Sequence, residues 1–351
     1  MIALTDILKE AVSLEASDIF IVAGGNVSAK YDGEIHALSE EKVMPKETEA
    51  LISEMYSMAG RSMDEYIKSG DDDFSFSVPG LARFRANAYK QRGSLAAVVR
   101  VVAFDIPDYR EYMIPEEVMK LSELTHGMVL FTGTAGSGKS TTQACLVDRI
   151  NENESFHIIT LENPIEYLHR NKKSIVSQRE IELDTGDYLS ALRACLRQAP
   201  NVIQLGEMRD LETTRTAMTA AETGHLIFAT LHTKGAVNAI DRIIDEFPAF
   251  QQDQIRVQLA SVLRTVVSQQ LLPGTDGELV PAFEIMHVNG AIKNMIRDNK
   301  GHQINVAIST GAAEGMISMD QSIAGLYREG KITKEVALEY ADNPAQLDRI
   351  L

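Results

Sequence analysis

The stretch that most limits the fold of this chain is Gly127–Thr142, which reads GMVLFTGTAGSGKSTT. A run of apolar residues leads into a glycine-rich turn that fits the pattern G-x-x-x-x-G-K-[ST], and a run suited to a helix follows. This order predicts a strand, a loop whose backbone N–H groups surround an anion, and a helix whose N-terminus faces that anion. The alternative, a surface glycine turn, does not account for the strand before it and the helix after it.

The same stretch predicts which groups would hold a nucleotide. Lys139 is placed to reach the β- and γ-phosphates, and the Ser140 hydroxyl is placed to ligate Mg²⁺. The predicted phosphate-binding residues are consecutive: Gly133, Thr134, Ala135, Gly136, Ser137, Gly138, Lys139, Ser140 and Thr141. The loop therefore predicts a site for a nucleotide such as ATP together with Mg²⁺.

Composition and charge limit the class of protein. With 351 residues, of which 44% are hydrophobic and 24% charged, the chain is expected to form two globular domains. The formal net charge of −16 argues against a general nucleic-acid-binding surface, although it leaves room for a local basic groove. Acidic residues near the start, Asp6 and Glu10, argue against a signal peptide, and no stretch is apolar enough to span a membrane. The two cysteines, Cys145 and Cys195, are expected to be buried and reduced rather than ligands of zinc.

The first part of the chain predicts a small domain of mixed structure. Residues 1–104 contain helical spacing and several segments with strand-like alternation, which together predict an α+β domain. Two prolines close together, Pro107 and Pro115, and several charges indicate a linker at 105–115. We therefore place the domain boundary there.

The remainder predicts an α/β domain. In residues 116–351, strands and helices alternate after the glycine-rich loop, which predicts a mostly parallel sheet with ligands at the C-terminal ends of its strands. A long helix is expected at 250–272, then one further strand, and then a helical region from about 290 to 351.

Two predicted strands after the loop end in carboxylates. Glu162 follows the first, where a carboxylate can orient water or bind Mg²⁺ through water. Glu207 follows the second and resembles a Walker B position, which supports the Mg²⁺ and its water shell. Each carboxylate alone is also consistent with a solvated turn, but the order of the segments after the phosphate loop favours a role at the site.

His225 and His232 flank the next predicted strand. Their odd separation places them on opposite faces of one strand, which argues against a shared zinc site. His232 lies at the C-terminal end, where it could sense the γ-phosphate, whereas a structural role is expected for His225.

A dense set of arginines lies on predicted strands of the first domain. Phosphoryl transfer needs positive charge at its transition state, and an arginine from another domain or subunit often supplies it. The alternatives are a solvated face of the sheet and an arginine finger that completes a nucleotide site. The set consists of Arg83, Arg85, Arg92 and Arg100.

Together, these segments resemble the secretion ATPase superfamily and, within it, the PilT family of type IV pilus retraction ATPases, over nearly the whole chain. The glycine-rich loop matches Walker A, and further segments resemble the Asp box (159–167, ITLENPIEY), Walker B (206–213, GEMRDLET) and the His box (219–233). Residues 73–76 and 83–85 resemble the PAS-like N-terminal domain of the family. Residues 291–298, AIKNMIRD, resemble a family motif that is implicated in retraction.

The resemblance implies a RecA-like P-loop NTPase domain behind a PAS-like domain, assembled as a homohexamer with the nucleotide between the domains. It implies that Glu162 or Glu166 helps to activate water, that Glu207 supports Mg²⁺, that His232 belongs to the site, and that arginines of the PAS-like domain complete it. It also implies a cytoplasmic ATPase motor at the base of the pilus. Such a motor would turn an inner-membrane platform protein, extract pilin subunits and work alone or with a paralogous ATPase.

The sequence departs from the family pattern in several places. Asn163 stands where the family usually has Asp, and Thr134-Ala135 stands where Pro-Thr is usual. One alternative function is pilus extension or type II secretion, whose ATPases usually carry extra N-terminal domains and a four-cysteine zinc motif that we do not expect here. Another is a weakly hydrolysing partner of an active paralogue, which only the Asn163 change supports. The acidic charge disfavours a nucleic-acid motor.

Overall fold

The computed structural model describes residues 3–31, 33–102 and 106–351. The chain divides into two compact units, the first made of Met1–Asp105 with Glu166–Leu168, and the second made of Ile106–Ile165 with His169–Leu351. Asp105, where the predicted linker begins, and Phe104, the last residue of the predicted first domain, lie outside the described residues.

The described part of the predicted linker, 106–115, packs as part of the second unit. The Sγ of Cys145 donates to the backbone oxygen of Pro107 at 3.3 Å, and the side chain of Ile114 is buried. Cys145 and Cys195 are both buried free thiols, as the sequence predicts. Burial raises the pKa of the Cys145 thiol, so it remains protonated.

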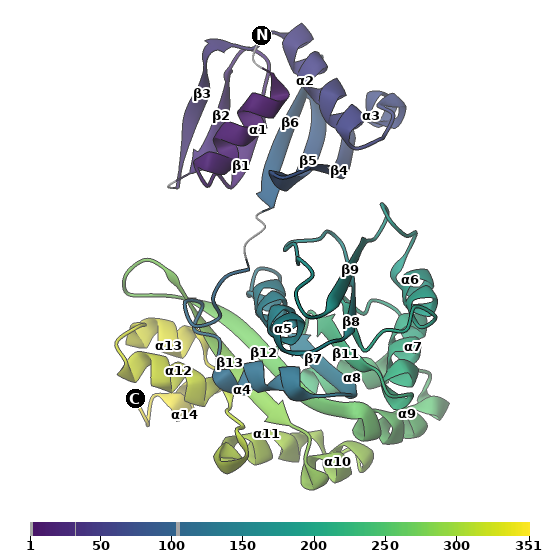
Figure 1. Ribbon diagram of the computed structural model, residues 1–351. Coiled ribbons are helices and arrows are strands. Elements are labelled where there is room, and N and C mark those ends of the chain that lie inside the picture. Colours follow the sequence, from purple (N-terminus) through teal and green to yellow (C-terminus); the bar gives the residue numbers. More distant parts are fainter. Residues whose placement is uncertain (1–2, 32, 103–105) are drawn as a thin grey trace. The chain divides into compact units, whose positions relative to one another are not determined.

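The first unit is an antiparallel sheet with helices on it (Figure 1). Its described elements are α1 (Leu4–Ser13), β1 (Asp18–Ile21), β2 (Asn26–Tyr31), β3 (Glu34–Lys42), α2 (Pro45–Met58), α3 (Asp64–Ser69), β4 (Asp71–Val78), β5 (Ala82–Gln91) and β6 (Ser94–Val102). The strand order is β3-β2-β1-β6-β5-β4, and α1 and α2 share a core with the sheet. Apolar alternation sets the faces, because β5 buries Phe84 and Ala86 while Arg83 and Arg85 remain partly exposed.

The second unit contains the phosphate loop and a larger sheet. Its described strands are β7 (Gly127–Thr132), β8 (His157–Glu162), β9 (Ile175–Glu180), β10 (Val202–Leu205), β11 (Leu226–Leu231), β12 (Leu263–Pro273) and β13 (Leu279–His287). Helix α4 (Glu116–Met119) precedes these strands, and the helices between them are α5 (Lys139–Asn153), α6 (Tyr188–Cys195), α7 (Leu211–Glu222), α8 (Ala236–Asp245) and α9 (Ala249–Val262). The strand order is β13-β12-β7-β11-β10-β8-β9, and all neighbours are parallel except β12 and β13.

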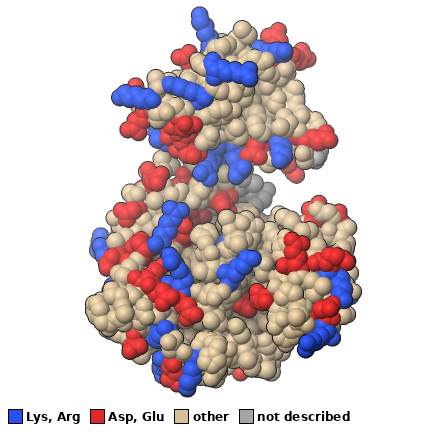
Figure 2. Space-filling view, turned by 180° about the vertical axis from the view of Figure 1, so that it is seen from behind, with Lys and Arg blue, Asp and Glu red and all other residues tan. Residues whose placement is uncertain are grey.

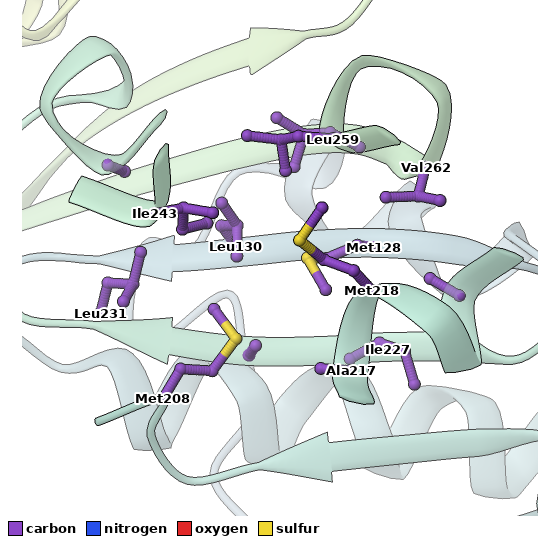
Figure 3. Packing of buried hydrophobic residues seen from close by; sticks show 14 of the residues in the cluster. Met128, Leu130, Met208, Ala217, Met218, Ile227, Leu231, Ile243, Leu259 and Val262 are labelled. Atoms are coloured by element: carbon purple, nitrogen blue, oxygen red, sulfur yellow. The ribbon is translucent and has the colours of Figure 1, made fainter. Parts of the chain in front are cut away.

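Helices cover both faces of this sheet. On one face of β7, Met128 and Leu130 pack with α7, α8 and α9 (Figure 3) and also with α6. On the other face, Val129 and Phe131 pack with α4 and α5. A strand that is buried on both faces is apolar at every position, which explains the continuous apolar run before the phosphate loop.

The long helix predicted at 250–272 is wrong in its second half. The helix α9 ends at Val262, and the chain continues as β12 between β7 and β13. Residues 265–270 of this strand are all buried. A strand buried on both faces has no alternation, so periodicity could not distinguish this segment from a buried helix. The β-branched residues Thr265, Val266 and Val267 were the available signal for a strand.

Short helices follow β13, as predicted for the region from about 290. They are α10 (Gly290–Arg297), α11 (Gly301–Thr310), α12 (Met319–Arg328), α13 (Lys334–Tyr340) and α14 (Pro344–Leu347). The side chains of Asn289, Ser318 and Thr333 cap α10, α12 and α13 by accepting a backbone N–H of the first turn.

The described chain contains no helix that is both long enough and apolar enough to cross a membrane. On the face shown in Figure 2, acidic and basic side chains are interspersed over each unit. The opposite charges therefore lie side by side on that face, although the net charge is −16.

The buried core of the second unit gives a direct test of the fold. Leu130 is fully buried among side chains of the sheet and helices. We expect Leu130→Ala to lower the free energy of unfolding by about 2–5 kcal/mol, because the truncation leaves a cavity. Urea unfolding followed by far-UV circular dichroism measures this change. The matched control is Leu183→Ala at an exposed position, with an expected change within about 0.5 kcal/mol; equal losses would contradict the assigned packing.

Candidate nucleotide site

The phosphate loop connects the end of β7 to the start of α5. Gly133, Gly136 and Gly138 have φ angles of 141°, 76° and 87°, a region that residues with a Cβ rarely adopt. The Lys139 Nζ donates to the backbone oxygens of Gly133 at 2.8 Å and Thr134 at 2.7 Å. The ammonium group therefore lies against the loop, at the N-terminal end of α5 where anions are favoured.

A residue that the sequence analysis missed, Gln269 on β12, holds the loop from the side. A Cβ at Gly133 would lie only 2.3 Å from the backbone oxygen of Gln269, so glycine is required there. The Thr142 Oγ1 of α5 donates to the Gln269 Oε1 at 2.9 Å. Because residues 263–272 were predicted as a helix, no pattern pointed to this contact.

The parallel register brings the predicted groups to the edge of the sheet that carries the loop. Thr132 of β7 is opposite Leu231 of β11, so the phosphate loop and His232 begin at the same level. Beyond β11 lie β10 and then β8, which lead into Glu207 and Glu162. Along this edge the order is therefore loop, His232, Glu207 and Glu162, with neighbouring strands about 4.8 Å apart.

Glu207 is a buried carboxylate beneath two exposed basic side chains. Its Oε2 lies 3.5 Å from the His232 Nε2, and its Oε1 lies 2.5 Å from the Arg209 Nη2. His232 was predicted from the sequence, whereas Arg209 was not. Burial, together with the nearby negative charge of Glu207, raises the pKa of Tyr188, so its hydroxyl stays protonated beside the site.

Glu162 is also buried, at the end of β8. Its Oε1 accepts hydrogen bonds from the Thr160 Oγ1 at 2.6 Å and the Gln178 Nε2 at 3.2 Å. Gln178, on β9, in turn accepts the backbone N–H of His169 through its Oε1 at 2.8 Å. Gln178 therefore fixes both the carboxylate and the segment after it, a role that the sequence analysis did not assign.

Glu166 lies in the short segment grouped with the first unit and is exposed. Arg92 is exposed at the tip of the hairpin between β5 and β6, with a φ of 47°. Both residues belong to the first unit, and their catalytic roles stay predictions.

The other predicted arginines lie together in the first unit. Arg85 and Arg100 are directly opposite each other on β5 and β6, and Arg83 is on the same face of β5. The Arg100 Nε lies 3.0 Å from an oxygen of Asp18 on β1. Arg92 is separated from Arg85 by about 20 Å of strand, at roughly 3.3 Å per residue. The four arginines that are close in the sequence therefore form one group of three in space, with Arg92 apart from them.

A cavity of about 600 Å³ lies beside the phosphate loop in the second unit. Its volume suits a small organic ligand. It is lined by Glu111, Tyr112, Met113, Ile114, Gly138, Thr141, Thr142, Gln269, Leu271 and residues 276–281. Since Gly138 and Thr141 belong both to the loop and to this cavity, a ligand with phosphates in the loop has room here for its remaining part.

The available donors fit Mg²⁺ shared with phosphates. Ser140 at the start of α5 and Glu207 at the sheet edge offer the oxygen ligands that Mg²⁺ prefers, and no group of three or more His, Cys, Asp or Glu in the described chain could hold a metal by itself. Mg²⁺ is usually held by one or two protein oxygens together with substrate phosphates and water. The site therefore fits a metal that arrives with the nucleotide.

Comparisons with known proteins identify the family of the chain. Residues 1–336 match the family model described as "Type II/IV secretion system protein". The chain is 41% identical to the type IV pilus retraction ATPase PilT of Pseudomonas aeruginosa over 342 residues, which cover 97% of this chain and 98% of that protein. It is 46% identical to a twitching motility protein of Neisseria gonorrhoeae over 279 residues, which cover 79% and 75% of the two chains.

A solved structure is also similar. The crystal structure of the pilus retraction motor PilT with bound ADP matches with a TM-score of 0.91 and 44% identity, covering 99% of this chain and all of that one. The resemblance to pilus retraction ATPases that the motifs indicate is confirmed, and so is the two-part α/β fold. The chain belongs to the family of type II/IV secretion system proteins.

Proposed function

We propose that this chain is an Mg²⁺-dependent ATPase motor that powers the retraction of type IV pili. The observation that carries the proposal is the order of groups along one edge of the sheet, where the phosphate loop, His232, Glu207 and Glu162 follow one another on adjacent strands. The similarity to a pilus retraction ATPase over the whole chain supports retraction rather than another use of the same core.

Each group has a separate task in this proposal. Lys139 and the loop amides bind the phosphates, and Mg²⁺, when bound, neutralises charge on the β- and γ-phosphates. Ser140 and Glu207 would hold the metal with its water shell. Glu162, fixed by Thr160 and Gln178, orients the attacking water. His232 contacts the γ-phosphate and links its presence to Glu207.

The motor is proposed to act as a homohexamer at the cytoplasmic face of the membrane, at the base of the pilus. Arginines of the first unit, from the set Arg83, Arg85 and Arg100, supply positive charge to a nucleotide bound by the second unit. Hydrolysis then changes the arrangement of the two units, which moves a membrane platform protein and releases pilin subunits from the fibre.

Hydrolysis itself is the first prediction. We expect the purified chain to release phosphate from Mg·ATP, with activity lost when the metal is chelated. Lys139→Ala removes a phosphate contact and Glu207→Gln removes a charge beside the metal, so each should lower turnover by about 100-fold or more. Lys334 forms an exposed ion pair with Asp348 in the C-terminal helices, so Lys334→Ala is the control and should leave turnover unchanged. Equal rates in the wild type and both site variants would refute the proposal that this site hydrolyses ATP.

A site shared between subunits makes a second prediction. If Arg83 acts on a nucleotide bound by a neighbouring subunit, mixing inactive Arg83→Ala with inactive Glu207→Gln creates some sites in which both residues are intact. ATP turnover of the mixture should then exceed the sum of the separate variants. Activity no greater than that sum, in mixtures shown to contain both chains, would contradict a shared site.

The direction of the motor is tested in cells. A strain without the gene should keep its pili, or carry more of them, and lose twitching motility, because extension continues without retraction. Counting pili by electron microscopy and measuring twitching zones provide the readouts, with the intact gene supplied in trans as the control. A strain without pili would instead assign the chain to extension.

A further inference from the structure

The helix that follows His232 begins without a cap of its own. The N-cap of α8 is Gly235, which has no side chain to accept the N–H groups of the first turn. Two residues from distant strands take that place. The Gly235 N–H donates to the Ser268 Oγ of β12 at 3.0 Å, and the Ala236 N–H donates to the Glu284 Oε1 of β13 at 2.7 Å.

Glu284 is buried close to the start of a second helix. The backbone N–H of Met319, the first residue of α12, lies near enough to lower the pKa of its carboxyl group. Burial raises the pKa of Glu284, and Asp320 and Asp342 raise it further, while the two backbone donors oppose this shift. Lys234 lies in the turn before α8, and its charge acts on Asp342 of the C-terminal segment.

The turn between His232 and Gly235 is thus held at both ends. At one end, His232 follows β11 and lies 3.5 Å from Glu207. At the other end, Glu284 and Ser268 fix the first N–H groups of α8. The turn is only four residues long, so the anchor at its end restricts where the His232 side chain can lie.

We infer that Glu284 is a positioning residue for ATP hydrolysis, which caps the start of α8 and thereby holds His232 against Glu207. This inference rests on the function proposed above. A carboxylate suits this role because both its oxygens are acceptors for the N–H groups at the start of a helix, whereas an amide of the same shape offers one oxygen and one donor group.

The experiment uses Glu284→Gln in the full-length chain. Turnover of ATP should fall about tenfold, as is typical when a residue that orients a functional side chain is changed. KM and ADP affinity should stay within twofold, because the phosphate loop follows β7 whereas Glu284 is on β13. Asp320→Asn is the matched control. Asp320 also lies near Glu284 but binds the backbone of Asp342 and Asn343 rather than α8, so its turnover should stay unchanged.

A double-mutant cycle distinguishes positioning from a general loss of stability. If Glu284 acts through His232, adding Glu284→Gln to His232→Ala should lower turnover by less than twofold more. A further tenfold loss in that background, a parallel loss of ADP affinity, or normal turnover of Glu284→Gln would each overturn the inference. Normal turnover of His232→Ala would overturn the inference too. If instead the wild type showed no hydrolysis that Lys139→Ala abolishes, the proposed function itself would be refuted.

A second variant removes the same bond from the other side. Ala236 is the first residue of α8, a position that tolerates proline, so Ala236→Pro deletes the N–H donor and keeps the carboxylate. Its turnover should match that of Glu284→Gln. Should Glu284→Gln fail to fold, Ala236→Pro decides the question, and unchanged turnover in that variant would contradict the inference.

Discussion

The parallel pairing of β7, β11, β10 and β8 is the constraint on which the whole site depends. Each strand delivers one group to the same edge, so the distances between the loop, His232, Glu207 and Glu162 follow from strand spacing and register. Helices bury both faces of these strands, and a slip of one residue would turn every side chain to the opposite face. The spacing of the groups along this edge is therefore set by the pairing and the burial of the strands.

Strands that hold no predicted catalytic group supply the polar side chains that hold such groups in place. Gln269 of β12 contacts the phosphate loop and α5, Gln178 of β9 holds Glu162, and Glu284 of β13 caps α8. A buried polar group without a partner is costly, so the buried Gln269 and Glu284 would be unfavourable in a sheet that served packing alone. Their hydrogen bonds account for the presence of these two polar side chains inside the sheet.

The sequence predicted the elements whose signals are local. The phosphate loop, the strands ending before Glu162 and Glu207, and the alternation of Arg83 and Arg85 follow from spacing within a few residues, and the structure contains them. The sequence did not predict β12, because a strand buried on both faces has no period. Gln269 could not be assigned a contact because it lies on this strand. Gln178 of β9 could not be assigned to Glu162 because the two residues are far apart along the chain. The separation of Arg92 from the other arginines depends on the length of the β5–β6 hairpin, and only pairing reveals it.

The geometry also bears on the Asn163 change, which is the one feature of the sequence that favours a weakly hydrolysing chain. Asn163 is exposed, whereas its neighbour Glu162 is buried and receives hydrogen bonds from Thr160 and Gln178. A charge on an exposed side chain is screened by water and salt, so an Asp at 163 would add little to the field at the sheet edge. Glu162, the carboxylate that hydrogen bonds hold in place, is retained. An exposed Asn in place of Asp at position 163 therefore gives no physical reason for slow turnover.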